Sequence, residues 1–431
     1  MRKLYDAFME AAAAHAKWDY EVSMNILHNR KKLFLLLLMA LPVILPAVAH
    51  AASSLPAVLG GKSAYAPSFF SPFVFYVSIA IGLCAGLITG CIGAGGGFII
   101  TPALMSAGVK GILAVGTDLF HIFAKAIMGT TVHKKLGNVH VGLAIAFLVG
   151  STAGVTFGGK LNRALYNANP VLSDTVISIV YVVMLGFLGT YALIDFLKSR
   201  KRAAASGAVH GGEDEELTVL AKRLQKSSIP PTIKFDQHIV PGGRKISAWF
   251  VAVCGAVVGL TAAIMGVGGG FLTFPMFVYG LGVSTATTVG TDILQIIFTA
   301  GYASISQYAL YGYIFYTLAM GMLIGSLIGI QIGAITTKVV SGSHIKGFYA
   351  VAILAGFFNR LMALPGKLNK MEVISISKTT AKVLTNIGNI TFFAIVTFFA
   401  VWVISKFASN FKQLRKEATL TGVIAGEKGV S

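Results

Sequence analysis

Long apolar runs separated by short polar stretches make up most of this chain of 431 residues. About 20 consecutive apolar residues are enough for an α-helix to cross a bilayer. In the first half, the pattern predicts helical segments at 72–91, 98–109, 112–132, 139–160 and 172–197. In the second half it predicts segments at 246–265, 271–282, 286–306, 313–336 and 345–365, followed by a last apolar run at 387–407. This pattern is typical of an all-α polytopic membrane protein.

The first apolar run, at 33–49, follows the basic triplet Arg30-Lys31-Lys32 and ends in Ala-His-Ala at 49–51. A basic segment, an apolar core and small residues are the parts of a secretory signal. The preceding segment is long for a cleaved signal, so we favour an uncleaved first helix with its amino end in the cytoplasm. Both alternatives leave residues 52–71 on the far side of the membrane.

The two halves of the chain carry copies of the same motifs. The first copy reads Gly-Ala-Gly-Gly-Gly-Phe at 93–98 with a proline at 102, and the second reads Gly-Val-Gly-Gly-Gly-Phe at 266–271 with a proline at 275. Each is followed by Val-Gly-Thr-Asp, at 115–118 and at 289–292. The interval between the two glycine motifs is almost the same as the interval between the two Val-Gly-Thr-Asp motifs. This spacing indicates an internal duplication, which is typical of transporters.

Counting crossings predicts that the two repeats are inverted. If residues 52–71 lie outside the membrane, then Lys134-Lys135 and the polar linker at 198–246 lie inside. The second repeat therefore begins on the opposite side of the membrane from the first. Each repeat then contains three full crossings and one re-entrant hairpin with a glycine turn. Lys367, Lys370, Lys378 and Lys382 would lie outside in this topology, against the positive-inside rule.

The glycine turns are the least helical backbone within the apolar sequence. Each glycine costs a helix about 1 kcal/mol relative to alanine. Irregular backbone survives at membrane depth only where it packs against protein or lines a cavity. The segment 98–109 would be about 18 Å long as a helix, too short to span alone. We therefore expect both turns to meet near the midplane, where exposed helix amino ends favour an anion.

The alternative is that the glycines only allow close helix packing. We assign that role to Gly150, Gly154 and Gly158, and to Gly325, Gly329 and Gly333, which are spaced by four. For the turns we favour function, because each is coupled to a proline and duplicated. The expected substrate-binding residues are Gly93, Gly95, Gly96, Gly97 and Thr117 in the first half and Gly266, Gly268, Gly269, Gly270 and Thr291 in the second.

A polar stripe follows each turn, on the helix that contains Thr-Asp. The candidate coupling residues are Asp118, His121 and Lys125 in the first half and Asp292 and Gln295, with Thr299, in the second. The first three fall at i, i+3 and i+7, on one helix face. Ionisable side chains inside a membrane span face the bundle interior or a pore. The aspartates either contact substrate or protons, or cap amides of the glycine turns; the two roles are compatible.

Two residues of this stripe leave alternatives open. Histidine ordinarily changes charge between about pH 5 and 8, so His121 is a candidate proton carrier, although a lone histidine is often only packed. Lys125 either balances Asp118, attracts an anion or extends to the cytoplasmic surface.

Composition agrees with the membrane assignment. Hydrophobic residues make up 55% of the chain and charged residues only 12%, about half the share of an ordinary soluble domain. The net charge of +19 arises from clusters that flank apolar runs, which favours cytoplasmic loop ends over nucleic-acid binding. Cys84, Cys91 and Cys254 lie inside predicted spans without metal-ligand spacing. Within the linker, Leu217, Leu220 and Leu224 have the spacing of a short amphipathic helix.

At the duplicated glycine and Val-Gly-Thr-Asp motifs, the sequence resembles the TauE/SafE family of membrane proteins, often called sulfite exporters. The resemblance covers about residues 72–365. It implies a permease for small sulfur anions such as sulfite, sulfoacetate or related sulfonates, usually outwards. The linker and the terminal segments are additions to the family pattern.

The sequence thus predicts two inverted repeats with broken hairpins and extra terminal helices, in a multi-pass protein of the cell (inner) membrane. We divide the chain into an N-terminal arm and first helix (1–71), a first repeat (72–197), a cytosolic basic linker (198–246), a second repeat (247–365), and a last helix with a basic tail (366–431). We expect a proton- or cation-coupled secondary transporter of small anions, without enzymatic activity, cofactor or metal. Its partners are the anion and the bilayer, not nucleic acid, and a homo-oligomer stays an open alternative.

Two other functions stay open. The first is a cation or metal transporter that uses Asp118, Asp292 and His121 as ligands. The second is a membrane sensor that acts through the cytosolic linker. No Walker A sequence is present, so direct drive by ATP within this chain is not expected.

Overall fold

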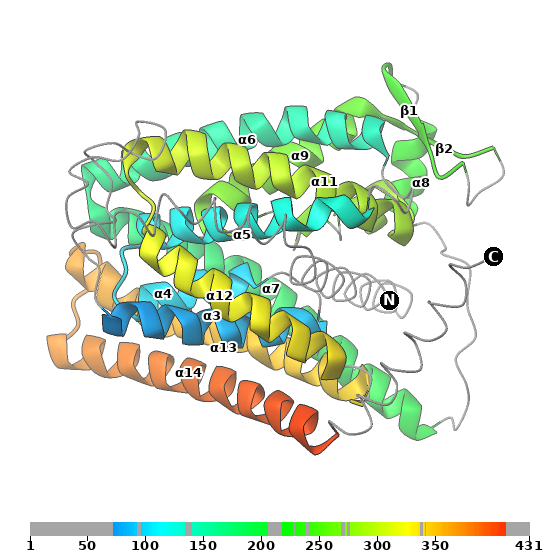
Figure 1. Cartoon of the computed structure of the whole chain (residues 1–431). Coiled ribbons are helices and arrows are strands. Elements are labelled where there is room, and N and C mark those ends of the chain that lie inside the picture. The colour runs from blue at the N-terminus through cyan, green and yellow to red at the C-terminus, as the bar shows by residue number, and fades with distance from the viewer. Residues whose placement is uncertain are drawn as a thin grey trace.

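The computed structural model describes residues 72–92, 96–133, 140–205, 218–227, 229–237, 242–268, 272–273, 276–336, 339–340 and 342–410. The apolar run at 33–49, Lys134-Lys135 and the basic tail beyond residue 410 lie outside the described residues. Within them the protein is almost entirely helical, which confirms the predicted all-α polytopic class (Figure 1).

The helices of the first half match their predicted segments closely. They are α3 (Pro72–Ile92), α4 (Gly97–Ser106), α5 (Gly111–His133), α6 (Val141–Ala168) and α7 (Pro170–Ala205). The short α4 begins directly after the first glycine turn, as expected for the second arm of a broken hairpin. The helix α7 continues past its predicted end at residue 197, into the segment assigned to the linker.

The second half contains three helical segments of unusual pitch. Its α-helices are α9 (Ala248–Met265), α11 (Thr285–Tyr302), α12 (Tyr316–Thr336), α13 (Gly342–Lys370) and α14 (Lys378–Ser409). The unusual segments are the π-helices η4 (Met276–Leu281) and η5 (Ala303–Tyr308) and the 3₁₀ turn η6 (Ala309–Tyr311). The prediction of a regular helix at 271–282 was therefore too simple. Single π-turns of this kind are rare and frequently occur at functional sites.

Six described helices are long and apolar enough to cross a membrane: α6, α7, α9, α12, α13 and α14. The helices α5 and α11 carry the polar stripes, and the bundle buries much of both. Residues 111–119 of α5, for example, are all buried.

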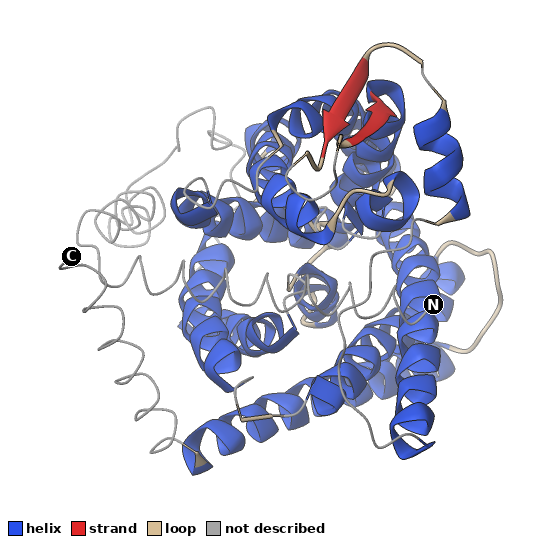
Figure 2. Cartoon of the chain, turned by 90° about the vertical axis from the view of Figure 1, so that its right-hand side faces the viewer, coloured by secondary structure: helices blue, strands red, loops and turns tan. Residues whose placement is uncertain are grey.

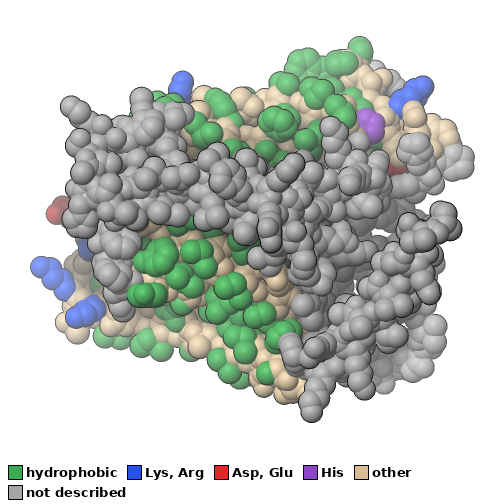
Figure 3. Space-filling model, viewed as in Figure 1, with side chains coloured by type: hydrophobic (Ala, Val, Ile, Leu, Met, Phe, Trp, Pro, Cys, Tyr) green, Lys and Arg blue, Asp and Glu red, His purple; other side chains and the backbone are tan. Residues whose placement is uncertain are grey.

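Apolar side chains cover the outside of the bundle. In Figure 3 they gather over the middle of the visible face, and Lys and Arg side chains lie towards its ends. Examples of strongly exposed apolar residues are Val149 and Phe157 on α6, Phe187 on α7 and Ile390 on α14. In water such a surface would be unfavourable, whereas lipid tails cover it without cost.

Glycines allow the halves to pack closely through two helix pairs. On α3, a Cβ at Gly82 or Gly86 would collide with the backbone of α12 at Met322 or Ser326. The glycines that we assigned to packing lie at these interfaces, and this role is confirmed. On α6, Gly150, Gly154 and Gly158 face the backbone of α9, and on α12, Gly325, Gly329 and Gly333 face that of α3.

The helix pairs α3–α12 and α9–α6 make equivalent contacts. The helix from the first half in one pair corresponds to the helix from the second half in the other. Gly82 on α3 meets Met322 on α12, and Gly255 on α9 meets Phe147 on α6. The interval along the chain from Gly82 to Gly255 equals that between the two glycine motifs, and the interval from Phe147 to Met322 is nearly the same. Equivalent positions of the duplication thus make equivalent contacts across the halves. The inverted orientation of the two repeats stays a prediction, which this exchange supports.

The linker folds into a small cap at one end of the bundle. It contains α8 (Val219–Lys226) and the antiparallel hairpin of β1 (Thr232–Phe235) and β2 (Arg244–Ser247). The amphipathic helix was predicted, whereas the hairpin was not. Seen along the bundle in Figure 2, the two strands and α8 lie together at one corner.

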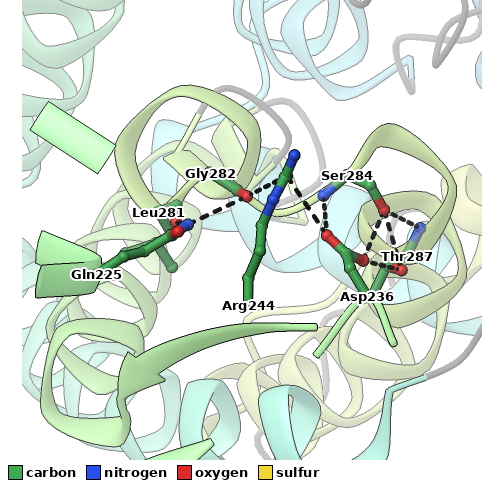
Figure 4. Close-up of polar contacts among 7 residues, drawn as sticks. All are labelled: Gln225, Asp236, Arg244, Leu281, Gly282, Ser284 and Thr287. Carbon is green, nitrogen blue, oxygen red and sulfur yellow. Dashed lines mark hydrogen bonds and ion pairs between the residues drawn. The ribbon is translucent and has the colours of Figure 1, made fainter. Parts of the chain in front are cut away.

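This cap holds the segment between η4 and α11. Asp236 accepts hydrogen bonds from the backbone N–H of Ser284 (2.8 Å), the hydroxyl of Ser284 (2.7 Å) and the hydroxyl of Thr287 (2.5 Å) (Figure 4). Arg244 lies 3.6 Å from Asp236 and donates to the carbonyl of Gly282 at 2.8 Å. These bonds fix the start of α11, the helix that carries the second Thr-Asp pair.

Candidate functional site

The two glycine turns meet inside the bundle. A Cβ placed on Gly97 would lie 2.9 Å from the Cα atom of Val267 and 3.4 Å from the carbonyl oxygen of Gly266. The hydroxyl of Tyr181 on α7 lies 2.6 Å from the carbonyl oxygen of Met265 and 3.4 Å from that of Gly97. One buried side chain therefore bridges both turns. Glycine is required at position 97 because any side chain would force the turns apart.

The first turn ends at the amino end of α4. Gly96 occupies the cap position without a side-chain hydrogen bond, and its carbonyl oxygen accepts from the N–H groups of Ile99 (3.0 Å) and Ile100 (3.1 Å). Helix geometry leaves the amide of Gly97, at the first helical position, without an intrahelical acceptor. In the second half, α9 ends at Gly266 with φ 82°, a left-handed conformation that favours glycine.

On α5, Asp118 and His121 form a buried polar pair beside this contact. Asp118 is 0% exposed and His121 is 2% exposed. The Oδ2 atom of Asp118 accepts a hydrogen bond from the hydroxyl of Thr101 on α4 at 2.9 Å. The Nε2 atom of His121 lies 2.9 Å from the hydroxyl of Ser326 on α12. Each side chain is thus held at one of its two polar atoms.

The other two atoms of this pair face each other without hydrogen bonds. Asp118 Oδ1 and His121 Nδ1 are 3.7 Å apart, and neither has a hydrogen-bond partner. That distance is too long for a direct hydrogen bond, so both atoms remain available to a proton or a ligand. Lys125 is half-buried on the same helix, two turns further along from Asp118.

The corresponding residues on α11 bond to one another instead. The amide nitrogen of Gln295 donates to Asp292 and, at 3.1 Å, to the hydroxyl of Thr273. The hydroxyl of Thr299 donates to the Gln295 carbonyl oxygen at 3.1 Å, and it lies 3.0 Å from the hydroxyl of Ser151 on α6. The second stripe is therefore a connected network, in which Asp292 is only 6% exposed.

The threonines of the duplicated motif tie each site helix to the other half. The hydroxyl oxygen of Thr117 accepts from the backbone N–H of Phe315 (2.9 Å), and that of Thr291 accepts from the N–H of His140 (3.2 Å). His140 and Phe315 are separated by nearly the interval that separates the duplicated motifs, so these two bonds are again equivalent. Each hydroxyl keeps its own proton as a donor.

The structure therefore brings some of the predicted residues together and places the others on separate partners. Gly97, Gly266 and Asp118 are in contact around the first turn, whereas Gly93, Gly95, Gly269 and Gly270 lie outside the described residues. Gly96 caps α4, and a Cβ at Gly268 would meet the side chain of Ile122. Sequence reasoning missed Thr101, Ser326 and Tyr181, because their roles depend on contacts between helices far apart in the chain.

The geometry does not support the alternative that Asp118, His121 and Asp292 bind a metal ion together. Within the described ranges, which include Asp118, His121 and Asp292, no group of three or more His, Cys, Asp or Glu side chains could hold a metal ion. The cysteines are free thiols, and Cys91 donates to the carbonyl oxygen of Gly333 at 3.3 Å.

Six membrane-length helices among the described residues, the contact between the two glycine motifs and a buried polar pair beside it define a polytopic membrane transport protein. The chain belongs to the sulfite exporter TauE/SafE family, whose model matches residues 78–359. This match confirms the resemblance stated from the duplicated motifs.

Similar proteins from bacteria and plants agree with this family. A probable membrane transporter protein of Xylella fastidiosa (strain 9a5c) is 23% identical over 274 residues, covering 62% of this chain and 87% of the relative. The probable membrane transporter protein YunE of Bacillus subtilis is 24% identical over 298 residues, covering 65% and 96%. The TauE/SafE family protein 6 of Arabidopsis thaliana is 32% identical over 109 residues, covering 24% and 26%. No solved structure matches significantly.

Proposed function

We propose that this protein is a secondary transporter of small anions in the cell (inner) membrane, with sulfite, sulfonates and other organosulfur anions as its substrate class. The observation that carries this proposal is the contact of the two glycine turns over Asp118 and His121. The amino end of α4 offers backbone N–H groups and a partial positive charge at this place.

The same geometry supports coupling to protons. A buried carboxylate and a buried imidazole, with unbonded atoms 3.7 Å apart, can hold a single proton between them. Loading or releasing that proton changes the charge beside the anion site. The charge change would favour anion entry in one protonation state and anion release in the other.

In this proposal the anion site has one side in each half of the chain, and the two halves move relative to each other during transport. Gly97 belongs to the first half and Val267 to the second, and transporters built from two inverted repeats, as predicted for this chain, alternate access by rocking one unit against the other. A substrate between the turns would contact both halves at once.

A flux assay in reconstituted liposomes tests the proposal. The panel contains sulfite, a sulfonate such as sulfoacetate, a carboxylate such as acetate, and the divalent cations Zn²⁺ and Mg²⁺. We expect protein-dependent flux of the sulfur anions that responds to an imposed pH gradient. Flux of the cations, with none of any anion, would overturn the proposal in favour of a cation transporter.

A further inference from the structure

Arg360 is a buried arginine in the middle of a membrane-length helix. It lies on α13, within the candidate span Gly347–Lys370, and is only 2% exposed. Its guanidinium donates to the Oδ1 atom of Asn359 (2.7 Å from Nε), the carbonyl oxygen of Pro102 (3.2 Å from Nη2) and the hydroxyl of Ser106 (2.6 Å from Nη2). Pro102 and Ser106 belong to α4, the arm that begins at the first glycine turn.

All of these partners are neutral. Among the described residues, no carboxylate forms an ion pair with Arg360. No described residue accepts a hydrogen bond from the Nη1 atom of Arg360 either. Asp174 on α7 forms no ion pair with Arg360 either, and its Oδ1 atom accepts the N–H of Gly111 at 2.7 Å. A buried charge without a counter-charge is strongly destabilising, so such a residue inside a membrane span indicates a function.

A second cation lies further along the same face of α13. Lys367 follows Arg360 at i+7, which is two helical turns or about 10 Å. Its Nζ atom donates to the carbonyl oxygen of Asp174 (3.0 Å) and the hydroxyl of Ser178 (2.9 Å) on α7. These acceptors are again neutral. Arg360 and Lys367 therefore form a line of positive charge towards the carboxyl end of α13.

We propose that Arg360 binds the transported anion, as a second station between the glycine turns and the end of the bundle at Lys367. This inference rests on the proposed function and adds a residue outside the duplicated motifs. The ligand class is a small oxyanion, because Nη1 keeps two N–H groups that no described residue accepts, and these can donate to the oxygen atoms of an anion. Its Nη1 group is the donor that such an anion would meet, because the Ser106 hydroxyl already donates to Asn359 Oδ1 at 3.1 Å.

The alternative is a structural role, in which Arg360 only ties α4 to α13. The two roles differ in what a nearby negative charge would do. Asn359 accepts from Arg360 through Oδ1 and donates to Asn389 at 2.9 Å. Asn359→Asp keeps the acceptor and supplies a permanent counter-charge. An anion-binding arginine would then lose its ligand, whereas a structural arginine would be held at least as well.

The experiment measures stabilisation of the purified full-length protein against thermal unfolding by increasing sodium sulfite, at constant ionic strength. The variants are Asn359→Asp, Arg360→Gln and Arg360→Lys, and the matched control is Lys378→Gln, which removes one exposed positive charge at the start of α14. We expect the half-saturating sulfite concentration to rise at least about tenfold in Asn359→Asp and Arg360→Gln, which corresponds to about 1.4 kcal/mol. It should rise less in Arg360→Lys and stay unchanged in the control.

The outcomes separate this inference from the proposed function. Unchanged sulfite affinity in Asn359→Asp and in either Arg360 variant, with wild-type protein responding to sulfite, would reject the role of Arg360 and leave the proposed function standing. Absence of any anion response or anion flux in the wild type would reject the proposed function itself. If Arg360→Gln does not fold, Asn359→Asp and Arg360→Lys decide between binding and structure.

Discussion

The polar stripes of α5 and α11 descend from one pattern but differ in how far their hydrogen bonds are completed. On α11, Gln295 links Asp292 to Thr273 and Thr299, and the network continues to α6. On α5, Asp118 and His121 each keep one buried atom without a partner. Since an unsatisfied buried polar group costs about 1–3 kcal/mol, the pair Asp118 and His121 carries a cost that the pair Asp292 and Gln295 avoids.

This difference suggests a division of labour between the halves. A completed network holds its helix in place, whereas an incomplete one can accept a proton or a ligand atom. The two stripes differ at one key position: the first has His121 where the equivalent residue of the second is Gln295. The duplication therefore supplies an internal control for each of the following predictions.

The largest effect is expected from Asp118→Asn. Asparagine keeps the size and still accepts from Thr101, but it holds neither a negative charge nor an exchangeable carboxyl proton. Coupled anion flux should fall by at least about tenfold, which corresponds to about 1.4 kcal/mol. The matched variant Asp292→Asn still accepts from Gln295 and should lose much less flux. Both are compared in liposome flux at equal protein levels, and equal losses would remove the distinction between the halves.

Gly97→Ala should be the next most damaging change. The new methyl group would meet the Cα atom of Val267 at 2.9 Å, where backbone must move. Overpacking of this kind typically costs about 1–3 kcal/mol. The control is Gly280→Ala in η4, where an added Cβ meets nothing within 4 Å. Thermal unfolding of the purified variants measures both, and a Gly97→Ala protein as stable and active as the control would contradict the contact between the turns.

His121→Gln gives the first half the glutamine of the second. The new amide can donate to Asp118 as Gln295 donates to Asp292, which completes the network and removes the imidazole. We expect most of the stimulation by a pH gradient to disappear, while gradient-free anion exchange is kept. Gln295→His is the reciprocal variant and should retain the stimulation. Full stimulation of flux in His121→Gln would show that the histidine only packs.

Asp236→Asn in the cap is expected to have the smallest effect on flux. Asp236 has φ 55°, a conformation that asparagine adopts equally well, so the variant removes charge without straining the backbone. Hydrogen bonds to a charged group contribute about 1.5–3 kcal/mol, and the loss should lower the unfolding temperature. Flux per folded molecule should stay close to wild type. A change in flux with no change in stability would instead assign the cap a regulatory role, as the sensor alternative requires.

Much of this architecture could be predicted from the sequence because the signals are local. Apolar length located α3, α6, α7, α9, α12, α13 and α14 to a good approximation, and the spacing of four identified the packing glycines. The i, i+3 spacing placed Asp118 and His121 on one face, where they lie 3.7 Å apart. The π-helical pitch of η4 and the β1–β2 hairpin in the linker were not foreseen. Both depend on how the cap packs against the second-repeat segment that contains η4.

The amino-acid sequence by itself determined the membrane class, the duplication, its glycine breaks and the polar stripe after each break. These follow from hydropathy and periodicity, which act over a few helical turns. Only the tertiary structure decided which polar atoms remain without partners and that Arg360 has only neutral ones. Decisive partners come from helices in the other half of the chain, as with His121 and Ser326 or Arg360 and Pro102. Sequence spacing carries no record of those contacts, because they are created when the two halves pack together.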